Sequence, residues 1–354
     1  MKLNKGDKVA IISLSRGLLG EGFMKHQRKL IEKRLQSFGL EVVYTPNALK
    51  GIEFLKDNPK KRAQDLKWAF KDESIKGIIC AIGGDDTYRT LPYLLEDDEF
   101  KELVKTNPKL FIGYSDTTIN HLMFQKLGLP TFYGHSAIVD FGELDDEMLP
   151  YSKKWFEKLF NIEENIEIES SAIWYLERED FSQTQIGISR IVKKETHGIE
   201  ILSGEGNVSG ELFGGCVESL GELLLGDRYG DEAKMNERYQ LFPTRKELKG
   251  KIIFLENSDE QPTPQRLRQL LEVLDEHGLF EQASGVIIGK PQDETYYDEY
   301  KLLYKEIIGK YEMPVFYNLN FGHAHPKCIL PYGASAELDV MNKKVVIKDW
   351  LKEK

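Results

Sequence analysis

A serine stands at a sharp corner of the chain, in the segment KLFIGYSDTTINHLMFQKLG from 109 to 128. The segment reads as a short apolar strand, a Gly-x-Ser turn and an amphipathic helix. Ser115 could cap the helix, because a hydroxyl oxygen accepts hydrogen bonds from first-turn N–H groups. Alternatively, the turn is a nucleophile elbow that exposes the hydroxyl and directs helix N–H groups at an oxyanion. Other residues of the sequence decide between these interpretations.

A serine nucleophile needs a base at neutral pH, and the base is commonly histidine. Four of the seven histidines lie in helical or polar patterns that indicate no site: His26, His121, His197 and His277. His135 ends a strand in YGHS, where nothing further supports a site. The other two stand together in FGHAHP, as His323 and His325.

The H-A-H pair has two interpretations. Two imidazoles at a spacing of two on a strand point to the same side and could bind zinc, with His135 brought close by the fold. No neighbouring cysteine or carboxylate completes such a ligand set in the sequence. A histidine that directly follows a glycine also suits a general base, which must approach its nucleophile closely, and this favours His323. We therefore expect no metal and no other cofactor.

The orienting carboxylate of such a base is best sought at Glu256. This residue ends the strongly apolar strand in IIFLENSDE. A glutamate at a strand end is either a surface residue that caps the next helix or a partly buried partner of a cation, and the sequence leaves both open. Asp259 and Glu260 are expected to be less buried competitors.

Two further features could carry chemistry. Cys216 and Cys328 are possible nucleophiles because thiols are intrinsically reactive. We expect neither to lie on a strand-to-helix elbow with a capped N-terminus, and we interpret both as small buried residues. The segment GEGNVSG does not match the G-x-G-x-x-G pattern and no Lys-Ser pair follows, so a phosphate-binding loop is not indicated there.

The elements that position these residues alternate between strand and helix in the first part of the chain. Apolar strands are predicted in KVAIISL, EVVYT, IKGIICAIGG, KLFIG and PTFYGH. Helical patterns separate them, including one that starts with Asn58 as cap and Pro59 at its first position. The alternation predicts an α/β fold with a doubly wound, flavodoxin-like parallel sheet. Its ligand crevice would lie beyond the carboxyl ends of the strands, where GGDD (83–86) and GYSD (113–116) both fall.

The length of 354 residues favours two domains. The pattern loosens into an acidic stretch from about 145 to 200, which we interpret as a connection and a solvated loop. We expect an N-terminal α/β domain over 1–165, a linker over 166–184, and a second α/β domain rich in short strands over 185–354. The second domain would carry Glu256 and His323.

Composition narrows the partners and the location. The formal net charge of −10 argues against nucleic acid and anionic membranes as partners. The three cysteines are odd in number and far apart, which indicates reduced thiols. The apolar run from Val9 to Leu14 is too short for a signal-peptide core, and no segment approaches the roughly 20 apolar residues of a membrane-spanning helix. A cytoplasmic protein fits these observations best.

Several motifs, taken together and in order, resemble the LD-carboxypeptidase family of serine peptidases, and within it the microcin C immunity (MccF-like) branch. They are GGDDTYRTLP, FIGYSDTT, GELFGGCVESL, FLENSDE and FGHAHPKCILPYGASAELD, and they span nearly the whole chain. The resemblance implies a two-domain protein, commonly a homodimer, with Ser115 as nucleophile, His323 as base and Glu256 as orienting carboxylate. It also implies an oxyanion hole made by the N–H groups of Gly84 and Asp116.

The resemblance also implies two substrate classes. LD-carboxypeptidases remove a terminal D-alanine from a peptidoglycan tetrapeptide, whereas the immunity branch cleaves an amide between a peptidyl or aminoacyl group and a nucleotide, which detoxifies an antibiotic. The chain length and the GGDD form favour the immunity branch. Substrate contacts are then implied at Gly83, Asp85 and Trp174, whose ring could stack on a purine.

Two departures from the family pattern leave the substrate open. Cys216 stands in GGC where the family commonly has GGN, so an asparagine amide is missing there. After the glutamate, QPTPQRLRQL replaces a stretch that commonly resembles PYRIDRML. Two other classes of protein are also compatible with the residues: a two-domain binding module in which Ser115 belongs to a capped helix, and a zinc hydrolase.

Overall fold

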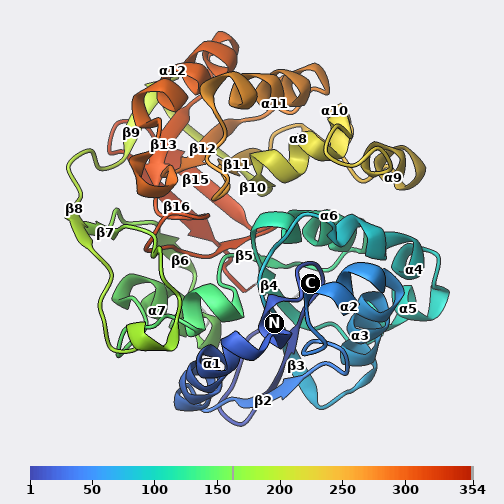
Figure 1. The fold of residues 1–354 in the computed structure, drawn as a ribbon. Coiled ribbons are helices and arrows are strands. Elements are labelled where there is room, and N and C mark those ends of the chain that lie inside the picture. Colours follow the sequence, from blue (N-terminus) through green and yellow to red (C-terminus); the bar gives the residue numbers. More distant parts are fainter. Residues whose placement is uncertain (162, 352–354) are drawn as a thin grey trace. The chain divides into compact units, whose positions relative to one another are not determined.

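The computed structural model describes residues 1–161 and 163–351, which divide into two units. Unit 1 contains residues 1–161 and Arg178–Arg190, and unit 2 contains Glu163–Glu177 and residues 191–351. The stretch 166–184, which we expected to be a linker, is therefore shared, with 166–177 in unit 2 and 178–184 in unit 1. Each unit has its own sheet with helices packed against it (Figure 1).

Unit 1 is built on parallel strands in the order β2-β1-β3-β4-β5. They are β1 (Lys8–Ile12), β2 (Glu41–Tyr44), β3 (Ile75–Cys80), β4 (Leu110–Gly113) and β5 (Phe132–Tyr133). The residues from Val9 to Ile12 have no exposed surface, as expected for a strand covered by helices on both faces. The order is that of flavodoxin-like sheets, so the predicted fold class is confirmed.

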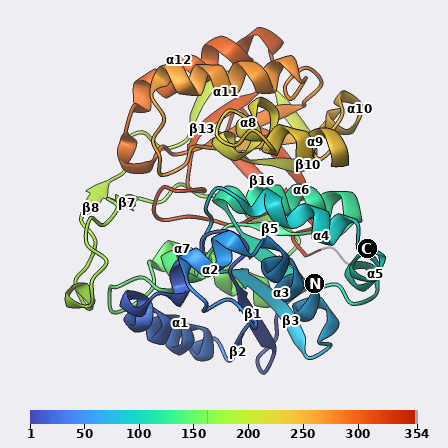
Figure 2. The same cartoon turned by 45° about the vertical axis from the view of Figure 1, so that its right-hand side comes forward.

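Helices lie on both faces of this sheet, with α1 and α7 on one side and α3, α5 and α6 on the other (Figures 1 and 2). The helices are α1 (Lys25–Ser37), α2 (Ile52–Asp57), α3 (Pro59–Lys71), α4 (Leu91–Leu95), α5 (Asp98–Thr106), α6 (Thr118–Leu127) and α7 (Pro150–Glu157). Pro59 takes the first position of α3, as expected. Asn58 occupies the cap position of this helix, but its side chain makes no cap hydrogen bond, and its amide donates to the carbonyl of Phe54 (2.8 Å).

The segment Arg178–Arg190 belongs to unit 1 because its charged ends bind a buried carboxylate. Glu143 accepts hydrogen bonds from the guanidinium groups of Arg178 (2.6 Å) and Arg190. Both arginine side chains are almost completely buried at this contact. Two cations around one carboxylate lower the pKa of Glu143 even though burial opposes its charge.

Unit 2 contains a mixed sheet in the order β6-β16-β15-β10-β11-β12-β13-β9. Its parallel centre consists of β10 (Asn207–Cys216), β11 (Ile252–Glu256), β12 (Gly285–Gly289) and β13 (Val315–Leu319). Antiparallel strands flank this centre: β6 (Asn165–Glu167), β9 (Glu200–Ser203), β15 (Ser335–Asp339) and β16 (Lys344–Lys348). The second sheet-rich domain is therefore confirmed.

Unit 2 also contains α-helices and further short strands. The helices are α8 (Val217–Leu225), α9 (Glu232–Tyr239), α10 (Arg245–Leu248), α11 (Pro264–Glu276) and α12 (Tyr297–Ile308). The strands are β7 (Ile173–Tyr175), which pairs with β8 (Val192–Lys194), and β14 (Leu330–Pro331). The expectation of a plain connection from 145 to 200 missed the strands β6, β7 and β8, and it gave no hint that Trp174 and Tyr175 are buried.

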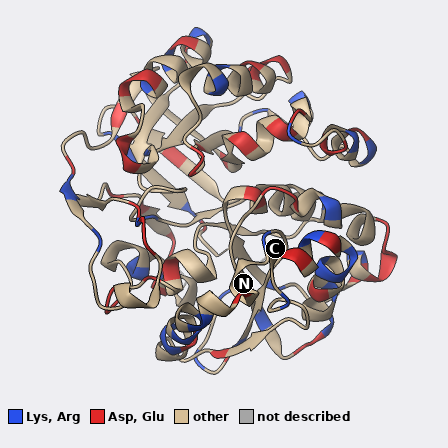
Figure 3. Ribbon diagram, viewed as in Figure 1, with Lys and Arg blue, Asp and Glu red and all other residues tan. Residues whose placement is uncertain are grey.

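Charged residues and cysteines occur in both units. Acidic and basic residues are interspersed along the helices of both units (Figure 3). The three cysteines are buried and form no disulfide. Across 1–161 and 163–351, the helices are all too short or too polar to cross a membrane.

Candidate active site

Ser115 occupies a strained corner of unit 1. It follows β4 and opens the 3-10 turn Ser115–Thr117, which leads into α6. Its φ of +64° lies in the left-handed region, which is unfavourable for any residue except glycine. Tyr114, not Ser115, occupies the cap position of this turn, and the N–H of Ser115 donates to the hydroxyl of Tyr133 (3.2 Å). The interpretation of Ser115 as a helix cap is therefore wrong.

The glycine loop after β3 contacts this corner. A Cβ at Gly83 would lie 2.7 Å from the Cβ of Ser115 and 2.8 Å from its Oγ, so only glycine fits there. Gly84 has a φ of +149°, and a Cβ at this position would collide with Ser15. Asp85 is exposed, and its N–H donates to the hydroxyl of Ser15 (3.1 Å). Sequence order and fold together thus bring Gly83, Gly84 and Ser115 to one place.

Buried carboxylates hold this loop in place. Asp116 accepts a hydrogen bond from the N–H of Thr87 (2.9 Å), which ties the loop to the turn of Ser115. Burial raises the pKa of Asp116 to about 6. Asp86 accepts two hydrogen bonds from the fully buried guanidinium of Arg62 (2.6 and 3.0 Å) and one from the hydroxyl of Ser15 (3.2 Å).

In unit 2, Glu256 and His323 form a buried pair. Glu256 ends β11, and its Oε2 accepts hydrogen bonds from the main-chain N–H (3.1 Å) and the Nδ1 (2.7 Å) of His323. Burial disfavours a charged imidazole, but the carboxylate outweighs this effect and raises the pKa of His323. Because a carboxylate only accepts hydrogen bonds, the proton of the neutral ring sits on Nδ1 and Nε2 carries the lone pair.

Gly322 makes this close pairing possible. Its φ is +86°, and a Cβ at this position would overlap the carboxylate of Glu256. Glu256 is completely buried, so it is not a surface cap. Asp259 is the exposed competitor, as expected, although its Oδ1 lies 3.7 Å from Nε2 of His323.

The zinc interpretation of H-A-H finds no support in the described residues. The segment 321–326 is not a strand, and the two histidines have different partners. His323 binds Glu256, whereas Nε2 of His325 lies 3.0 Å from Oε2 of Glu177. His135 is buried in unit 1 with its Nε2 at 2.8 Å from the carbonyl of Ser152. Within 1–161 and 163–351, no group of three or more histidine, cysteine or acidic residues could hold a metal ion.

Cys216 is a buried residue at the junction of β10 and α8, as its interpretation as a small buried residue implies. It ends β10 directly before α8, in register with Glu256, and it occupies the cap position of α8 without a side-chain cap hydrogen bond. Its thiol is buried and donates to Oε2 of Glu218 (3.2 Å). Burial, reinforced by the Glu218 carboxylate, raises the pKa of Cys216 well above its ordinary value, which disfavours a thiolate nucleophile. Burial raises the pKa of Cys328 as well.

Glu218 was missed by the sequence analysis. It accepts a hydrogen bond from the N–H of Ser258 (3.0 Å), two residues after Glu256. Burial, with Glu256 as a neighbouring charge, raises the pKa of Glu218 to about 7. The one signal in the sequence is an acidic residue in the first turn of a helix that follows a glycine-rich strand, a pattern that by itself indicates only a helix start.

Trp174 lies in β7 of unit 2. It is only 6% exposed, and Nζ of Lys290 stands 4.9 Å from the centroid of its ring. Its indole Nε1 has no hydrogen-bond partner among the described residues. One face of the ring is therefore covered by a cation, and any stacking partner would use the other face.

Comparison with known proteins relates both units to one family. The LD-carboxypeptidase N-terminal domain matches residues 9–134, and the LD-carboxypeptidase C-terminal domain matches residues 209–338. The crystal structure of an MccF-like protein from Streptococcus pneumoniae in complex with AMP is 43% identical, with a TM-score of 0.93, and the match covers 98% of this chain and 100% of that chain.

Two further relatives have names of different kinds. The microcin C7 self-immunity protein MccF of Escherichia coli is 28% identical over 82% of this chain and 78% of its own length. A Bacillus subtilis (strain 168) protein named "Probable murein peptide carboxypeptidase" is 26% identical over 99% of this chain and 94% of its own length.

Proposed function

Since the chain belongs to the LD-carboxypeptidase family and is a carboxypeptidase-like peptidase, we propose that it cleaves an amide bond with Ser115 as nucleophile, His323 as base and Glu256 as orienting carboxylate. The observation that carries this proposal is the buried pair in unit 2, where Nδ1 of His323 binds Glu256 at 2.7 Å. A histidine held in this way keeps Nε2 as a proton acceptor, as an orienting carboxylate does in serine hydrolases.

In the proposed mechanism, Nε2 of His323 takes the hydroxyl proton as Oγ of Ser115 attacks the carbonyl carbon of the amide. The imidazolium then gives this proton to the leaving amine as the C–N bond breaks, which leaves an acyl-enzyme. A water molecule, deprotonated by the same ring, hydrolyses the ester and restores the serine. The raised pKa of His323 supports this role, because the ring must gain a proton in each half-reaction.

The N–H groups of Gly84 and Asp116 would stabilise the oxyanion in both half-reactions. The contact of Gly83 with Ser115 supports this assignment, because it carries the backbone of the glycine loop to the nucleophile. The left-handed backbone of Ser115 supports it too, since strain of this kind is retained where the surrounding structure and function require it. Each such donor is worth about 3 kcal/mol in the transition state.

For the substrate we propose an amide that joins an aminoacyl or short peptidyl group to a nucleotide. The 43% identity to the S. pneumoniae protein solved with AMP, and the similarity to the E. coli self-immunity protein, support this class. Trp174 would contact the base with the ring face opposite Lys290, and Gly83 and Asp85 would contact the substrate near the amide. Release of D-alanine from muropeptides is the second candidate, favoured by the similarity to the B. subtilis protein over 99% of this chain.

A comparison of wild type with Ser115→Ala tests the proposal. Both proteins are incubated with an aminoacyl sulfamoyl adenosine and with a peptidoglycan L,D-tetrapeptide, and products are followed by mass spectrometry. Ser209→Ala, a change at an exposed serine of β10, is the control and should keep wild-type activity. We expect the wild type to cleave the adenosine conjugate and Ser115→Ala to lose nearly all turnover. An active Ser115→Ala protein would refute the mechanism, and serine-dependent release of D-alanine alone would transfer the assignment to the second substrate class.

A further inference from the structure

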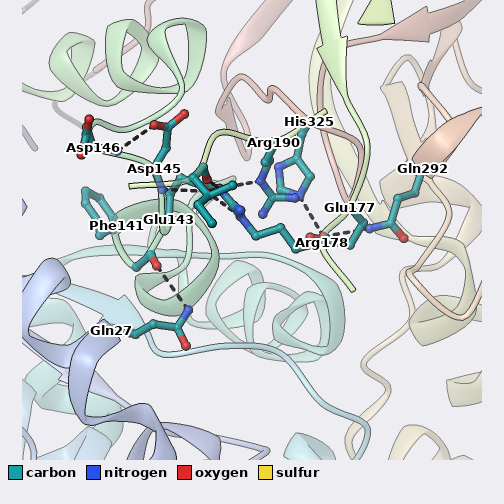
Figure 4. Close-up of polar contacts among 12 residues, drawn as sticks. Gln27, Phe141, Glu143, Asp145, Asp146, Glu177, Arg178, Arg190, Gln292 and His325 are labelled. Carbon is teal, nitrogen blue, oxygen red and sulfur yellow. Dashed lines mark hydrogen bonds and ion pairs between the residues drawn. The ribbon is translucent and has the colours of Figure 1, made fainter. Parts of the chain in front are cut away.

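The second histidine of FGHAHP has a carboxylate of its own. His325 is 3% exposed, and its Nε2 lies 3.0 Å from Oε2 of Glu177 (Figure 4). The same oxygen accepts a hydrogen bond from Nε2 of Gln292 (3.1 Å), whose side chain points toward Glu177 in Figure 4. The proposed mechanism uses neither His325 nor Glu177, although His325 is only two residues from His323.

Backbone hydrogen bonds join the same two segments. The N–H of Tyr175 in β7 donates to the carbonyl of His325 (3.0 Å), which forms an isolated antiparallel bridge. The N–H of Ser171 donates to Oδ1 of Asn320 (2.8 Å), and Nδ2 of Asn320 reaches the carbonyl of Pro326 (3.4 Å). The loop 320–326, which carries His323, is therefore tied at both ends to the segment that carries Trp174.

Lys290 fixes the ring of Trp174 from another direction. This lysine is buried, and its Nζ donates to Glu195 (3.0 Å) and Glu294 (2.6 Å) while it lies over the indole ring. Two carboxylates hold the cation in position, so the ring face below it has a fixed neighbour. A lysine held in this way orients the aromatic ring through a cation–π contact.

The loop that follows β12 connects Lys290 to Glu177 through hydrogen bonds to its residues Glu294 and Asp293. Asp293, Glu294 and Tyr296 all have positive φ angles of 55–56°, which are unfavourable for these residue types. The N–H of Glu177 donates to Oδ1 of Asp293 (2.8 Å), so the strained loop is attached to the segment of β7. Strained backbone persists only where its surroundings hold it, and here Glu177 and Lys290 supply those contacts.

We propose that His325 and Glu177 are positioning residues that fix β7, and with it Trp174, relative to the loop that carries His323. This inference rests on the proposed function, in which Trp174 contacts the base of a nucleotide conjugate while His323 acts on its amide. The pair then holds Trp174 in the position that binds the base, and so contributes to the affinity for the nucleotide conjugate. The Glu256–His323 pair does not depend on Glu177, because it is made by a different carboxylate.

The test compares two substrates that share the scissile bond. One is an aminoacyl sulfamoyl adenosine, and the other is the same aminoacyl sulfamoyl ribose without the base. In Glu177→Ala and in His325→Asn, we expect the KM for the adenosine conjugate to rise about tenfold with kcat changed by less than about twofold, since the lost contacts affect binding of the remote group. The base-free substrate should show wild-type kcat/KM.

Three further variants complete the experiment. Glu179→Ala removes an exposed glutamate of the same stretch and should behave as wild type. Glu177→Gln keeps an oxygen acceptor and should retain most of the affinity. If Glu177→Ala fails to fold by circular dichroism, His325→Asn provides the test. The variant that combines Glu177→Ala and His325→Asn should have a KM for the adenosine conjugate no higher than that of the more impaired single variant, because the two residues act as a pair.

An unchanged KM for the adenosine conjugate in both single variants would overturn the inference. An equal loss of kcat on both substrates would overturn it as well, because that result signals a general effect on the fold or on His323. Failure of the proposed function is seen separately, in a wild type that cleaves neither substrate or in an active Ser115→Ala protein. If the wild type cleaves neither substrate, the inference is refuted together with the proposed function on which it rests.

Discussion

Replacing Glu256 by glutamine tests the proposed catalytic pair most directly. Glutamine has nearly the same shape and keeps an oxygen that can accept the hydrogen bonds of the His323 N–H and Nδ1, but it removes the negative charge. The side chains of Glu256 and His323 are 0% and 7% exposed, so solvent screens their interaction little. The change therefore isolates the electrostatic contribution of the carboxylate to a base that becomes cationic during the reaction.

The expected loss follows from the geometry. With Nδ1 and Oε2 2.7 Å apart, the centres of the two charges are about 4 Å apart, and at an effective dielectric constant near 20 such charges attract by about 4 kcal/mol. The imidazolium exists only after the proton leaves Ser115, so this attraction stabilises the transition state and not the ground state. A loss of about 4 kcal/mol corresponds to about a 1,000-fold lower kcat.

The assay is the dependence of kcat/KM on pH for wild type and Glu256→Gln. In the wild type the carboxylate raises the pKa of His323, so activity rises with pH through a value above the ordinary one. Without the carboxylate, burial dominates and lowers this pKa. The acidic limb of the profile should thus move to lower pH while the plateau falls.

Asp259→Asn is the matched comparison. Its Oδ1 lies 3.7 Å from Nε2 of His323, but the side chain is 70% exposed, so we expect less than about a threefold effect on kcat. A plateau in Glu256→Gln within about tenfold of the wild type, or an acidic limb that does not move, would show that Glu256 does not stabilise the imidazolium.

Two further predictions concern residues next to the candidate catalytic groups. Gly83→Ala places a Cβ 2.7 Å from that of Ser115, and we expect kcat to fall by about 100-fold or more with an unchanged circular dichroism spectrum. Gly22→Ala is the control and should be neutral, because the added Cβ meets no atom within 4 Å. A wild-type kcat in Gly83→Ala would contradict the close contact. Glu218→Gln tests a buried acid whose pKa is raised to about 7. Because the native state holds this proton more tightly than the unfolded state, wild-type stability should decrease as pH rises from about 4.5 to about 7, by up to about 1.4 kcal/mol per unit from this group, and the variant should lose that slope in thermal unfolding measured from pH 5 to 8. Parallel slopes in the two proteins would mean that Glu218 does not titrate in this range.

The fold of unit 1 could be predicted because its signals are local. Each apolar strand is followed by a helical pattern, and short connections of this kind give a parallel sheet with few alternative orders. Signals that depend on a single side chain were less reliable. The side chain of Asn58 makes no cap hydrogen bond to the helix that it precedes, and its amide donates to the carbonyl of Phe54. The stretch from 163 to 200 was misread because its strands are only three residues long and alternate with acidic residues, which locally favour a solvated loop.

The two parts of the proposed triad differ in how the sequence encodes them. The strand, the turn and the helix around Ser115 all lie within twenty residues, so the corner is visible in a single motif. Glu256 and His323 are 67 positions apart, and their pairing depends on Gly322, whose missing Cβ leaves room for the carboxylate. Without that neighbour in view, a glutamate at a strand end is equally compatible with a surface cap, which is why its burial could not be predicted.

The same reasoning explains why His325 and Glu177 could not be recognised from the sequence. They are 148 positions apart, and neither lies in a regular helix or strand whose period would indicate the face it presents. His325 instead suggested a metal ligand, because its spacing from His323 assumed a strand that the chain does not form. The role of a polar residue that is close in sequence to a candidate catalytic residue is therefore best judged from its own hydrogen-bond partner. His323 and His325 share a motif, but they bind different carboxylates, and this difference in partner is the ground for proposing one as the base and the other as a residue that positions the neighbouring segment.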